Sequence, residues 1–249
     1  MKIISLNIRW GRMFENLKEF ILQSRNTTDI FCFQEIMRTI SDEKIVDEYY
    51  RANIYNELCD LLPEFVSYYA PYTTWSINGK VNYHLEWGNA IFARRTIWVQ
   101  STWIEYFWHY TDNIQNKNFQ YITIGHQWEQ LSIVNIHWLR TGTGKDDTDG
   151  RIEQFTTIKN FISNLHGKVV VIGDFNLNPD TQSLAILQLW MRNLISEYNI
   201  ESTRSKLYRQ YGQMHFADYA IISPEIAVKN FTVPYSEASD HLPLILEIT

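Results

Sequence analysis

Residues 169–176, Val-Val-Val-Ile-Gly-Asp-Phe-Asn, predict a buried strand that brings two polar side chains to its carboxyl end. Four apolar residues in a row favour a fully buried strand, and Gly173 ends it. Layered α/β proteins bind ligands at that end of their strands. Asp174 and Asn176, two residues apart, would point the same way in an extended chain. The alternative is a plain turn, since Gly, Asp and Asn favour turns and Asn-Pro-Asp follows at 178–180.

The composition of the 249-residue chain favours one globular domain over residues 1–249. Hydrophobic residues make up 45% of the chain and charged residues 20%, which is enough for a substantial core. The net charge of −6 excludes a global basic field for nucleic acid, so a metal ion would have to supply positive charge at a phosphodiester. Cys32 lies between Phe31 and Phe33, which indicates a buried thiol rather than half of a disulfide.

No signal-peptide core and no apolar run long enough to cross a membrane is found in the sequence. We therefore expect a cytoplasmic protein without stable membrane insertion. The oligomeric state stays open.

The first part of the chain predicts a parallel βαβ unit. The apolar run 3–6 ends at Asn7, a helical pattern follows, and a second strand over 29–33 ends at Gln34-Glu35. Parallel strands joined by one helix bring their carboxyl ends to the same sheet edge, so Asn7 and Glu35 are expected close together. The alternatives are a turn residue at Asn7 and a helix-capping or surface carboxylate at Glu35.

The rest of the chain also alternates helices and strands around a β-rich middle. This order predicts two sheets packed face to face with helices outside. A helix is expected over 42–62, and residues 196–215 are polar and irregular. The other expected strands are 65–70, 87–92, 97–104, 119–125, 130–138, 216–223, 226–233 and 244–248, and the other expected helices are capped by Asp149 and by Asp180 or Thr181.

Two histidines also fall where strands begin or end. His137 closes the alternating run from Leu131, and Asp240-His241 precedes the last strand. One such placement is common by chance, but the joint placement of six polar positions is not. The run Gly142–Lys145 is excluded as a phosphate-binding P-loop, because it lacks the earlier glycine and the following Ser or Thr of that motif.

The polar blocks, in order along the chain, resemble the successive motifs of the endonuclease/exonuclease/phosphatase superfamily. The resemblance spans the whole chain, and its most specific parts are Gly173–Asn176 and Ser239–Pro243. It implies an α/β fold, a four-layer αββα sandwich with two packed mixed β-sheets, and Mg²⁺-dependent cleavage of a phosphoester. Arg9 departs from the abasic-site endonucleases, which usually carry an acidic residue two places after the motif asparagine. The matching blocks are Leu6-Asn7, Gln34-Glu35, Asn135–His137, Gly173–Asn176, Asp218-Tyr219 and Ser239–Pro243.

A metal role suits three of these polar residues. A hard cation on Glu35, with Asn7 nearby, would neutralise the charge of a phosphodiester. Mg²⁺ is expected, with Mn²⁺ as the alternative, because Mg²⁺ needs only one or two carboxylates and keeps several waters. Asp240 is expected either to hold a metal or to orient the site.

Catalytic roles suit the remaining polar residues. Asp174 can accept a proton from the attacking water, with Asn176 orienting the water or the phosphate. His137 and His241 can bond the non-bridging oxygens. Asp218 is the expected partner of His241, fixing its tautomer and raising its pKa. Which group acts as acid and which as base stays open.

Four cationic side chains are available to bind phosphates: Arg140, Lys145, Arg151 and Arg204. The alternative for each is solvated surface, which we favour individually. The aromatic residues Trp98, Trp103, Tyr106, Phe107 and Trp108 crowd one stretch and could stack bases or insert among lipid headgroups. We favour a core-covering role for most of them.

The sequence favours a nuclease acting on DNA or RNA over two alternatives. The first is a lipid or small-molecule phosphoesterase, resembling sphingomyelinases or inositol-phosphate phosphatases. The second is a binding module that kept the fold and lost activity. Loss of Glu35, Asp174 or His241 would favour the binding module, and all three are present.

Overall fold

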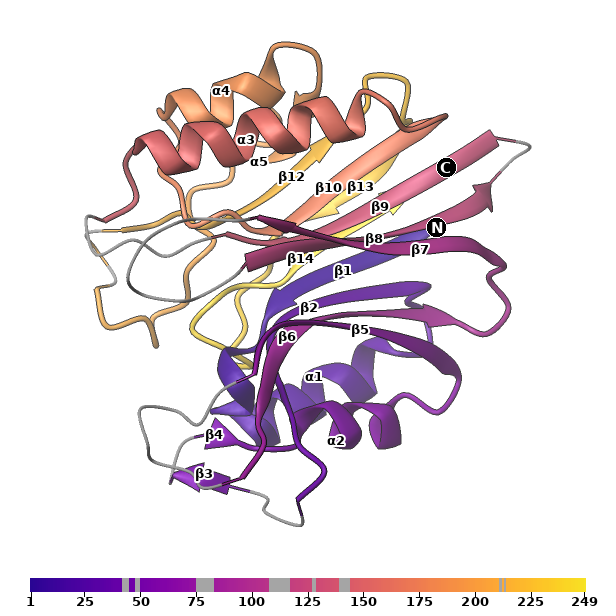
Figure 1. Cartoon of the computed structure of the whole chain (residues 1–249), viewed down its shortest axis with the longest axis vertical. Helices are drawn as coiled ribbons and strands as arrows, with labels where there is room; N and C mark the ends of the chain where they lie inside the picture. Colours follow the sequence, from indigo (N-terminus) through magenta and orange to yellow (C-terminus); the bar gives the residue numbers. More distant parts are fainter. Residues whose placement is uncertain are drawn as a thin grey trace.

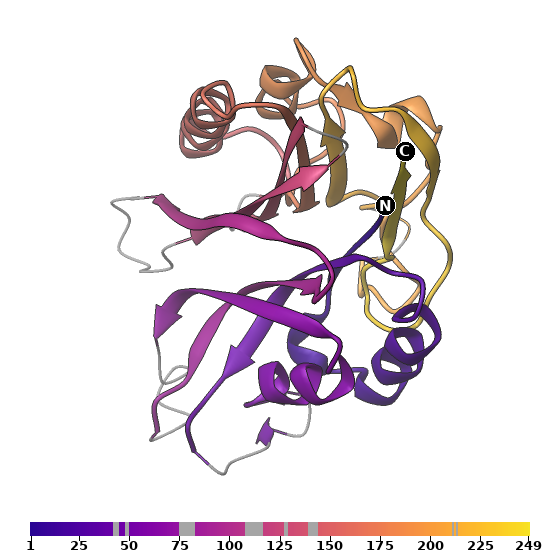
Figure 2. The same cartoon turned by 90° about the vertical axis from the view of Figure 1, so that its right-hand side faces the viewer.

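A computed structural model describes residues 1–41, 45–47, 50–74, 83–107, 117–126, 129–138, 144–210, 212 and 214–249. Two six-stranded β-sheets pack face to face, and helices cover the outer face of each (Figures 1 and 2). Each sheet mixes parallel and antiparallel pairs. The predicted four-layer α/β sandwich is confirmed.

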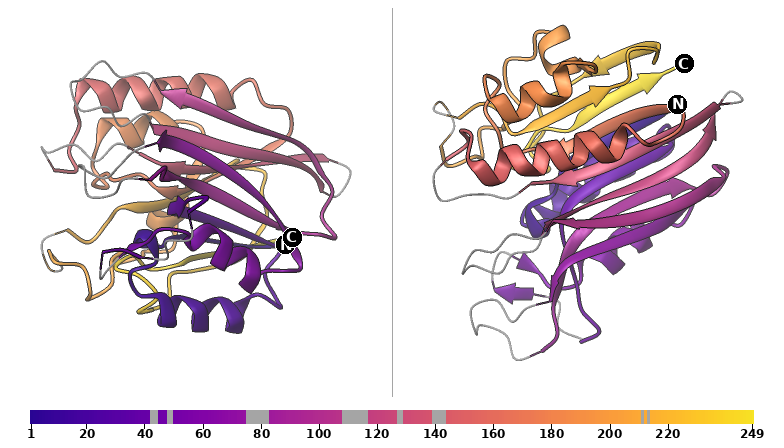
Figure 3. Two further views of the ribbon diagram at one scale, coloured as in Figure 1. Left: turned by 60° about the horizontal axis from the view of Figure 1, so that its bottom comes forward. Right: turned by 45° about the horizontal axis from the view of Figure 1, so that its top comes forward.

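The first sheet has the strand order β13-β14-β1-β2-β6-β5 and is covered by α1 and α2. β1 and β2 run parallel through α1, and β14 adds antiparallel to β1. The termini therefore lie side by side, with the Met1 ammonium donating to the Ile248 carbonyl at 2.7 Å (Figure 3). The elements are β1 (Lys2–Asn7), the short helix η1 (Arg9–Gly11), α1 (Phe14–Ser24), β2 (Ile30–Arg38), α2 (Ile54–Leu61), β5 (Phe65–Thr74), β6 (Glu86–Arg94), β13 (Val228–Thr232) and β14 (Leu244–Ile248).

The second sheet has the order β11-β12-β10-β9-β8-β7 and is covered by α3 and α4. β9 and β10 run parallel through α3, and β12 pairs antiparallel with β10. The elements are β7 (Val99–Phe107), β8 (Lys117–His126), β9 (Glu129–His137), α3 (Asp149–Ile162), β10 (Lys168–Asp174), α4 (Gln182–Gln188), β11 (Arg192–Asn193), α5 (Leu194–Glu197) and β12 (Asp218–Ile222).

The helix predicted over 42–62 is wrong in its first part. β3 (Ile45–Asp47) and β4 (Tyr50–Arg51) form a small antiparallel pair there, and only Ile54–Leu61 is helical. Residues 42–44 and 48–49 lie outside the described residues. β-branched and aromatic residues favour extended chain, and this preference outweighs the helical spacing of the apolar positions.

The N-terminal caps of α3 and α4 were predicted with different accuracy. Thr148, one residue before the expected Asp149, caps α3 by accepting from the Arg151 amide. Thr181 caps α4 through the Leu184 amide, as predicted. A hydroxyl can accept from an amide two or three residues on, and this satisfies one of the unpaired amides of the first turn.

Buried amide side chains join the two sheets within an otherwise apolar core. Gln34 of β2 donates from Nε2 to Oδ1 of Asn135 in β9 at 2.7 Å. Asn135 in turn donates to the carbonyls of Phe33 and Ala90, at 3.1 and 3.2 Å. Both amides are fully buried, so these bonds fix how the sheets sit on each other. Cys32, as expected, is a buried free thiol whose pKa burial raises.

We expect Asn135→Ala to lower the free energy of unfolding by about 2–3 kcal/mol, because it leaves buried polar groups of Gln34, Phe33 and Ala90 without this partner. Urea denaturation followed by circular dichroism measures the change. The control is Asn160→Ala on the exposed face of α3, which should change stability by less than about 0.5 kcal/mol. Equal losses in the two variants would contradict a specific inter-sheet role.

Candidate active site

The strand register of the second sheet places three predicted site residues in one row. Asp174 of β10 lies opposite His137 of β9 on one side and opposite Asp218 of β12 on the other. All three side chains are buried. The first sheet reaches this row through Asn7, whose Nδ2 donates to Asp174 Oδ2 at 2.9 Å. The site is therefore built by both sheets, and this hydrogen bond joins residues 167 apart in the chain.

Asp174 occupies the middle of the site. Its Oδ2 lies 3.7 Å from Nε2 of His137 and 3.7 Å from Nε2 of His241. Its Oδ1 accepts from the Asn176 backbone amide at 2.9 Å. The expected extended segment is therefore a turn at Asn176, which has a φ of 49° and donates from Nδ2 to the Trp138 carbonyl. Bonds to both oxygens fix the orientation of this carboxylate.

Gly173 is required by the close approach of β9. Its φ is 143°, and a Cβ atom there would lie 2.2 Å from the Ile136 carbonyl oxygen. Any larger residue would push β10 away from β9. The glycine therefore keeps Asp174 in register with His137.

Glu35 sits on a bulge rather than at a strand end. β2 continues to Arg38, and its pairing with β6 shifts between Phe33 and Ile36. Glu35 has a φ of 57°, which is costly for a residue with a side chain. The bulge re-aims the half-buried carboxylate, so that Oε1 lies 3.6 Å from His137 Nε2.

Two groups of side chains, within the described ranges, could hold a metal ion: Glu35 with His137 and Asp174, and Asp174 with Asp218 and His241. The ligand atoms of each group lie within 4.8 Å of one another. The first group suits a hard divalent cation best, because it brings carboxylates from both sheets together. Asn7 uses its amide nitrogen on Asp174 and its oxygen on the Arg9 amide at 3.0 Å, so it orients Asp174 directly.

The contact predicted between Asp218 and His241 is present. Nδ1 of His241 lies 2.9 and 2.8 Å from the two carboxylate oxygens of Asp218. Both side chains are buried, and burial raises the pKa of Asp218 to about 7. This geometry fixes the ring orientation and leaves Nε2 facing the row.

The expectation that the pKa of His241 is raised is wrong for this arrangement. Burial, and then the nearby Arg204 cation, lower the pKa of His241 to about 3. Asp174 and Asp240 act in the opposite direction but are outweighed. Loss of hydration penalises the imidazolium, so the neutral ring is favoured, with Nδ1–H donating to Asp218.

Asp240 pairs with Arg9 and lies outside both metal-capable groups that the described residues form. Its Oδ2 is 2.8 Å from Arg9 Nη1. Of the two roles expected for Asp240, holding a metal or orienting the site, this ion pair fits the second. Arg9 is a site residue that the sequence had marked only as a departure from one subfamily. Its place two residues after Asn7 was the available signal.

The four candidate phosphate-binding cations differ in position. Arg140 lies outside the described residues. Arg151 is almost fully buried and donates to the carbonyls of Gly144 and Asp146, so it holds the loop before α3. Lys145 is buried and donates to the Phe216 carbonyl. Arg204 is buried against His241.

The aromatic stretch on the edge strand β7 is more exposed than expected. Trp98 is 76% exposed and Trp103 57% exposed, so neither covers the core. Tyr106 donates to the Pro71 carbonyl at 2.9 Å and is 40% exposed. The side chain of Phe107 and the whole of Trp108 lie outside the described residues.

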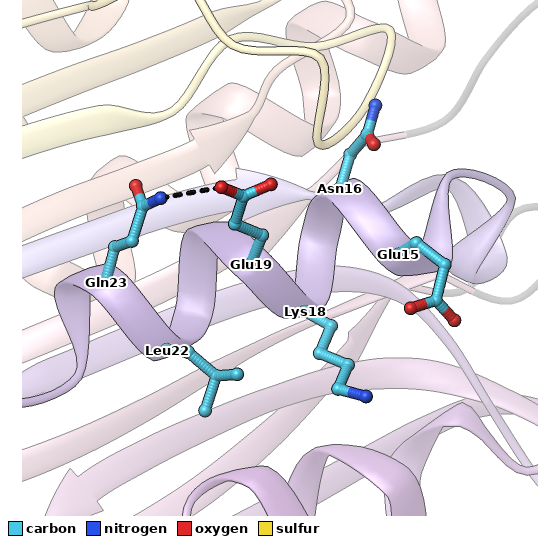
Figure 4. Close-up of a pocket in the computed structure, with 6 residues that line it drawn as sticks. All are labelled: Glu15, Asn16, Lys18, Glu19, Leu22 and Gln23. Carbon is cyan, nitrogen blue, oxygen red and sulfur yellow. Dashed lines mark hydrogen bonds between the residues drawn. The ribbon is translucent and has the colours of Figure 1, made fainter.

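The structure also has a hollow on the surface of α1. It is lined by polar side chains and Leu22, with Gln23 donating to Glu19 at 2.9 Å (Figure 4). None of the predicted site residues lines it. No helix in the described part of the chain is long and apolar enough to cross a membrane.

Solved structures with the same fold cover nearly the whole chain. An endonuclease/exonuclease/phosphatase family protein from Leptotrichia buccalis C-1013-b has 16% identity and a TM-score of 0.72, over 100% of this chain and 99% of that one. The endonuclease/exonuclease/phosphatase from Bacteroides vulgatus has 14% identity and a TM-score of 0.74, over 100% and 98%. The human Nocturnin catalytic domain, solved with a bound sulfate anion, has 18% identity and a TM-score of 0.67, over 100% and 93%.

At these identities the structural likeness shows the fold alone. No curated protein matches the sequence significantly. The family model described as the Endonuclease/Exonuclease/phosphatase family matches residues 4–241. That match includes every block of the candidate site from Asn7 to His241, and the chain therefore belongs to the Endonuclease/Exonuclease/phosphatase family.

Proposed function

We propose that this protein is a Mg²⁺-dependent phosphodiesterase, with nucleic acid as its substrate. The observation that carries the proposal is the convergence of Glu35, Asp174 and His137 beside the Asp218–His241 pair. Membership of a family described by endonuclease, exonuclease and phosphatase activities supports the reaction class. Mn²⁺ is the alternative ion, because it accepts the same oxygen-rich donor set.

The metal would be held by Glu35 and Asp174, and when bound it would neutralise charge on the phosphate oxygens. Asn7 and the Asn176 amide hold Asp174 through separate oxygens. This leaves Asp174 oriented between the two histidines and beside Glu35, as a ligand for the ion. His137 directs Nε2 toward Asp174, where a phosphate oxygen can meet it. Nε2 of His241 also faces Asp174, and it can donate to a phosphate oxygen only after it takes up a proton.

An activity panel with Mg²⁺ tests the proposal. The substrates are single-stranded DNA, duplex DNA, RNA, 5′-tyrosyl DNA, sphingomyelin and bis-p-nitrophenyl phosphate. Turnover of a nucleic acid that stops with EDTA and returns with Mg²⁺ is the expected result. Turnover of sphingomyelin alone would move the substrate to the lipid class. No turnover on any of them would contradict the proposal.

Glu35→Gln should keep the fold and either raise the Mg²⁺ concentration needed for half-maximal activity at least tenfold or abolish turnover. The reason is that a neutral amide replaces one of the two carboxylates expected to hold the ion. Activity is measured across a Mg²⁺ titration, with the melting temperature as the fold check. Glu64→Gln, at an exposed position, is the matched control. An unchanged Mg²⁺ dependence in Glu35→Gln would refute the metal role.

Asp218 and His241 should behave as one unit in catalysis. We expect His241→Ala and Asp218→Ala each to lower kcat/KM by roughly 10²–10⁴-fold. The double variant should lie within about tenfold of His241→Ala, because parts of one catalytic unit are non-additive. The measurement is kcat/KM for all four proteins after each has been shown to be folded. Losses that add in free energy would show that the two side chains act separately.

A further inference from the structure

The segment Thr203–Ser205 is bonded to the backbone on either side of His241. The Ser205 amide donates to the Asp240 carbonyl at 3.0 Å, and the Leu242 amide donates to the Thr203 carbonyl at 2.9 Å. Arg204 and His241 form an antiparallel bridge between these bonds. The loop that was expected to be irregular therefore contains a short strand-like segment. This segment fixes the backbone position of Arg204.

The same segment is also tied to the strand that carries Asp218. Oγ1 of Thr203 accepts from the backbone amides of Ala217 and Asp218, at 3.0 and 3.1 Å. Arg204 thus comes from a backbone held between the two members of the Asp218–His241 pair. The hydrogen bonds of the neighbouring residues therefore fix the backbone position of Arg204.

The Arg204 side chain lies against the nitrogen of His241 that faces the row. Nη1 of Arg204 contacts His241 Nε2, whereas the other ring nitrogen is engaged by Asp218. The Arg204 side chain is only 5% exposed. Any ligand oxygen that reaches His241 Nε2 must therefore also meet Arg204.

Within the described part of the chain, no carboxylate is hydrogen-bonded to the buried Arg204 guanidinium. Its nearest ion-pair partner is Asp240 Oδ2 at 3.9 Å, and that oxygen already lies 2.8 Å from Arg9 Nη1. Nε of Arg204 is buried and has no hydrogen-bond partner among the residues that the structure describes. A buried guanidinium normally has a carboxylate or phosphate on its planar fork of donors. Nη1 has the His241 ring nitrogen as its partner, but Nε lacks an acceptor, and an anionic oxygen would complete the donor set.

A second buried cation lies near Arg204. The Arg204 guanidinium carbon lies 4.2 Å from the centre of the Tyr208 ring, which supports the planar group. Nζ of Lys145 lies 5.5 Å from the centre of the same ring. Two buried cations therefore share one aromatic ring beside His241, which favours an anion there.

We propose that Arg204 binds a charged non-bridging oxygen of the phosphate beside His241 Nε2, and so restricts the substrates of this site to anionic phosphoesters. The proposal rests on the phosphodiesterase function proposed above. It assigns Arg204 a direct contact with the substrate and a role in specificity. In the ligand-free protein, the His241 ring occupies part of the fork that the phosphate oxygen would take.

Sulfate binding tests the contact without requiring turnover, because sulfate has the shape and charge of a phosphate dianion. Isothermal titration of sulfate into the Mg²⁺-loaded protein gives the affinity. Arg204→Gln should weaken sulfate binding by roughly 10- to 100-fold, as expected for loss of a charged hydrogen bond. Arg204→Lys should fall between wild type and Arg204→Gln, because it keeps the charge and loses the fork.

Arg209→Gln is the matched control, since Arg209 is an exposed arginine of the same loop and the charge change is identical. It should bind sulfate within about twofold of wild type. Equal weakening in Arg204→Gln and Arg209→Gln, or unchanged binding in Arg204→Gln, would overturn the contact. If Arg204→Gln does not fold, Arg204→Lys and a crystal soaked in sulfate decide. The anion should then lie within hydrogen-bond distance of Arg204.

A neutral substrate tests the specificity role. In a methylphosphonate diester, a methyl group replaces the charged non-bridging oxygen of the phosphodiester. Arg204→Gln should lower kcat/KM for the phosphodiester by roughly 10- to 100-fold and for the methylphosphonate by less than threefold. Equal losses on both substrates would mean that Arg204 only positions His241. Sulfate binding that depends on Arg204 in a protein without turnover would contradict the phosphodiesterase function and leave the anion contact intact.

Discussion

The hydrogen bond from Asn7 to Asp174 is the interaction on which the site depends most directly. It joins the first sheet to the second at the carboxyl ends of β1 and β10. Asp174 in turn lies in register with His137 and Asp218, so one bond sets the position of a whole row relative to Asn7. Gln34 and Asn135 repeat this kind of contact deeper between the sheets. Buried amides with fixed donors and acceptors specify one position of the first sheet relative to the second, which apolar packing alone does not.

The polar row also explains why the backbone is strained where it is. Glu35 and Asn176 both adopt positive φ angles that residues with side chains rarely take. At each of these positions the residue contacts the row: the Glu35 carboxylate lies near His137, and the Asn176 amide donates to Asp174. Such strain persists only when the surrounding structure holds it in place. The β2 bulge and the bonds of Asp174 and Asn176 provide that support here.

Charge balance is the second constraint on this site. Four carboxylates, Glu35, Asp174, Asp218 and Asp240, come together with little water around them. Arg9 offsets the charge of Asp240, and burial raises the pKa of Asp218. Glu35 and Asp174 remain as the pair that a divalent ion would neutralise. The buried Arg204 contributes positive charge to the site, beside a histidine that burial keeps neutral.

The sequence alone determined most of the strands, their order along the chain and most of the polar residues at or near their ends. Apolar runs with period two and helical spacing depend on local side-chain burial, so Asn7, His137, Asp174 and His241 could be placed without coordinates. The family motifs added the αββα layers. Only the tertiary structure decided how the residues between those motifs are used. Local pattern favoured a helix over 42–62, yet part of this segment pairs as β3 and β4.

The environments of the charged residues were also decided by the tertiary structure. Arg151 and Arg204 have equivalent side chains in the sequence, yet one is bonded to loop carbonyls and the other to His241. The pKa of His241 depends on burial and on a cation 37 residues away, and neither is visible in the Ser-Asp-His-Leu-Pro block. Sequence patterns report which residues end a strand. Loss of hydration on burial and contacts between distant charges arise only when the chain folds, and they decide which of those residues carry a charge.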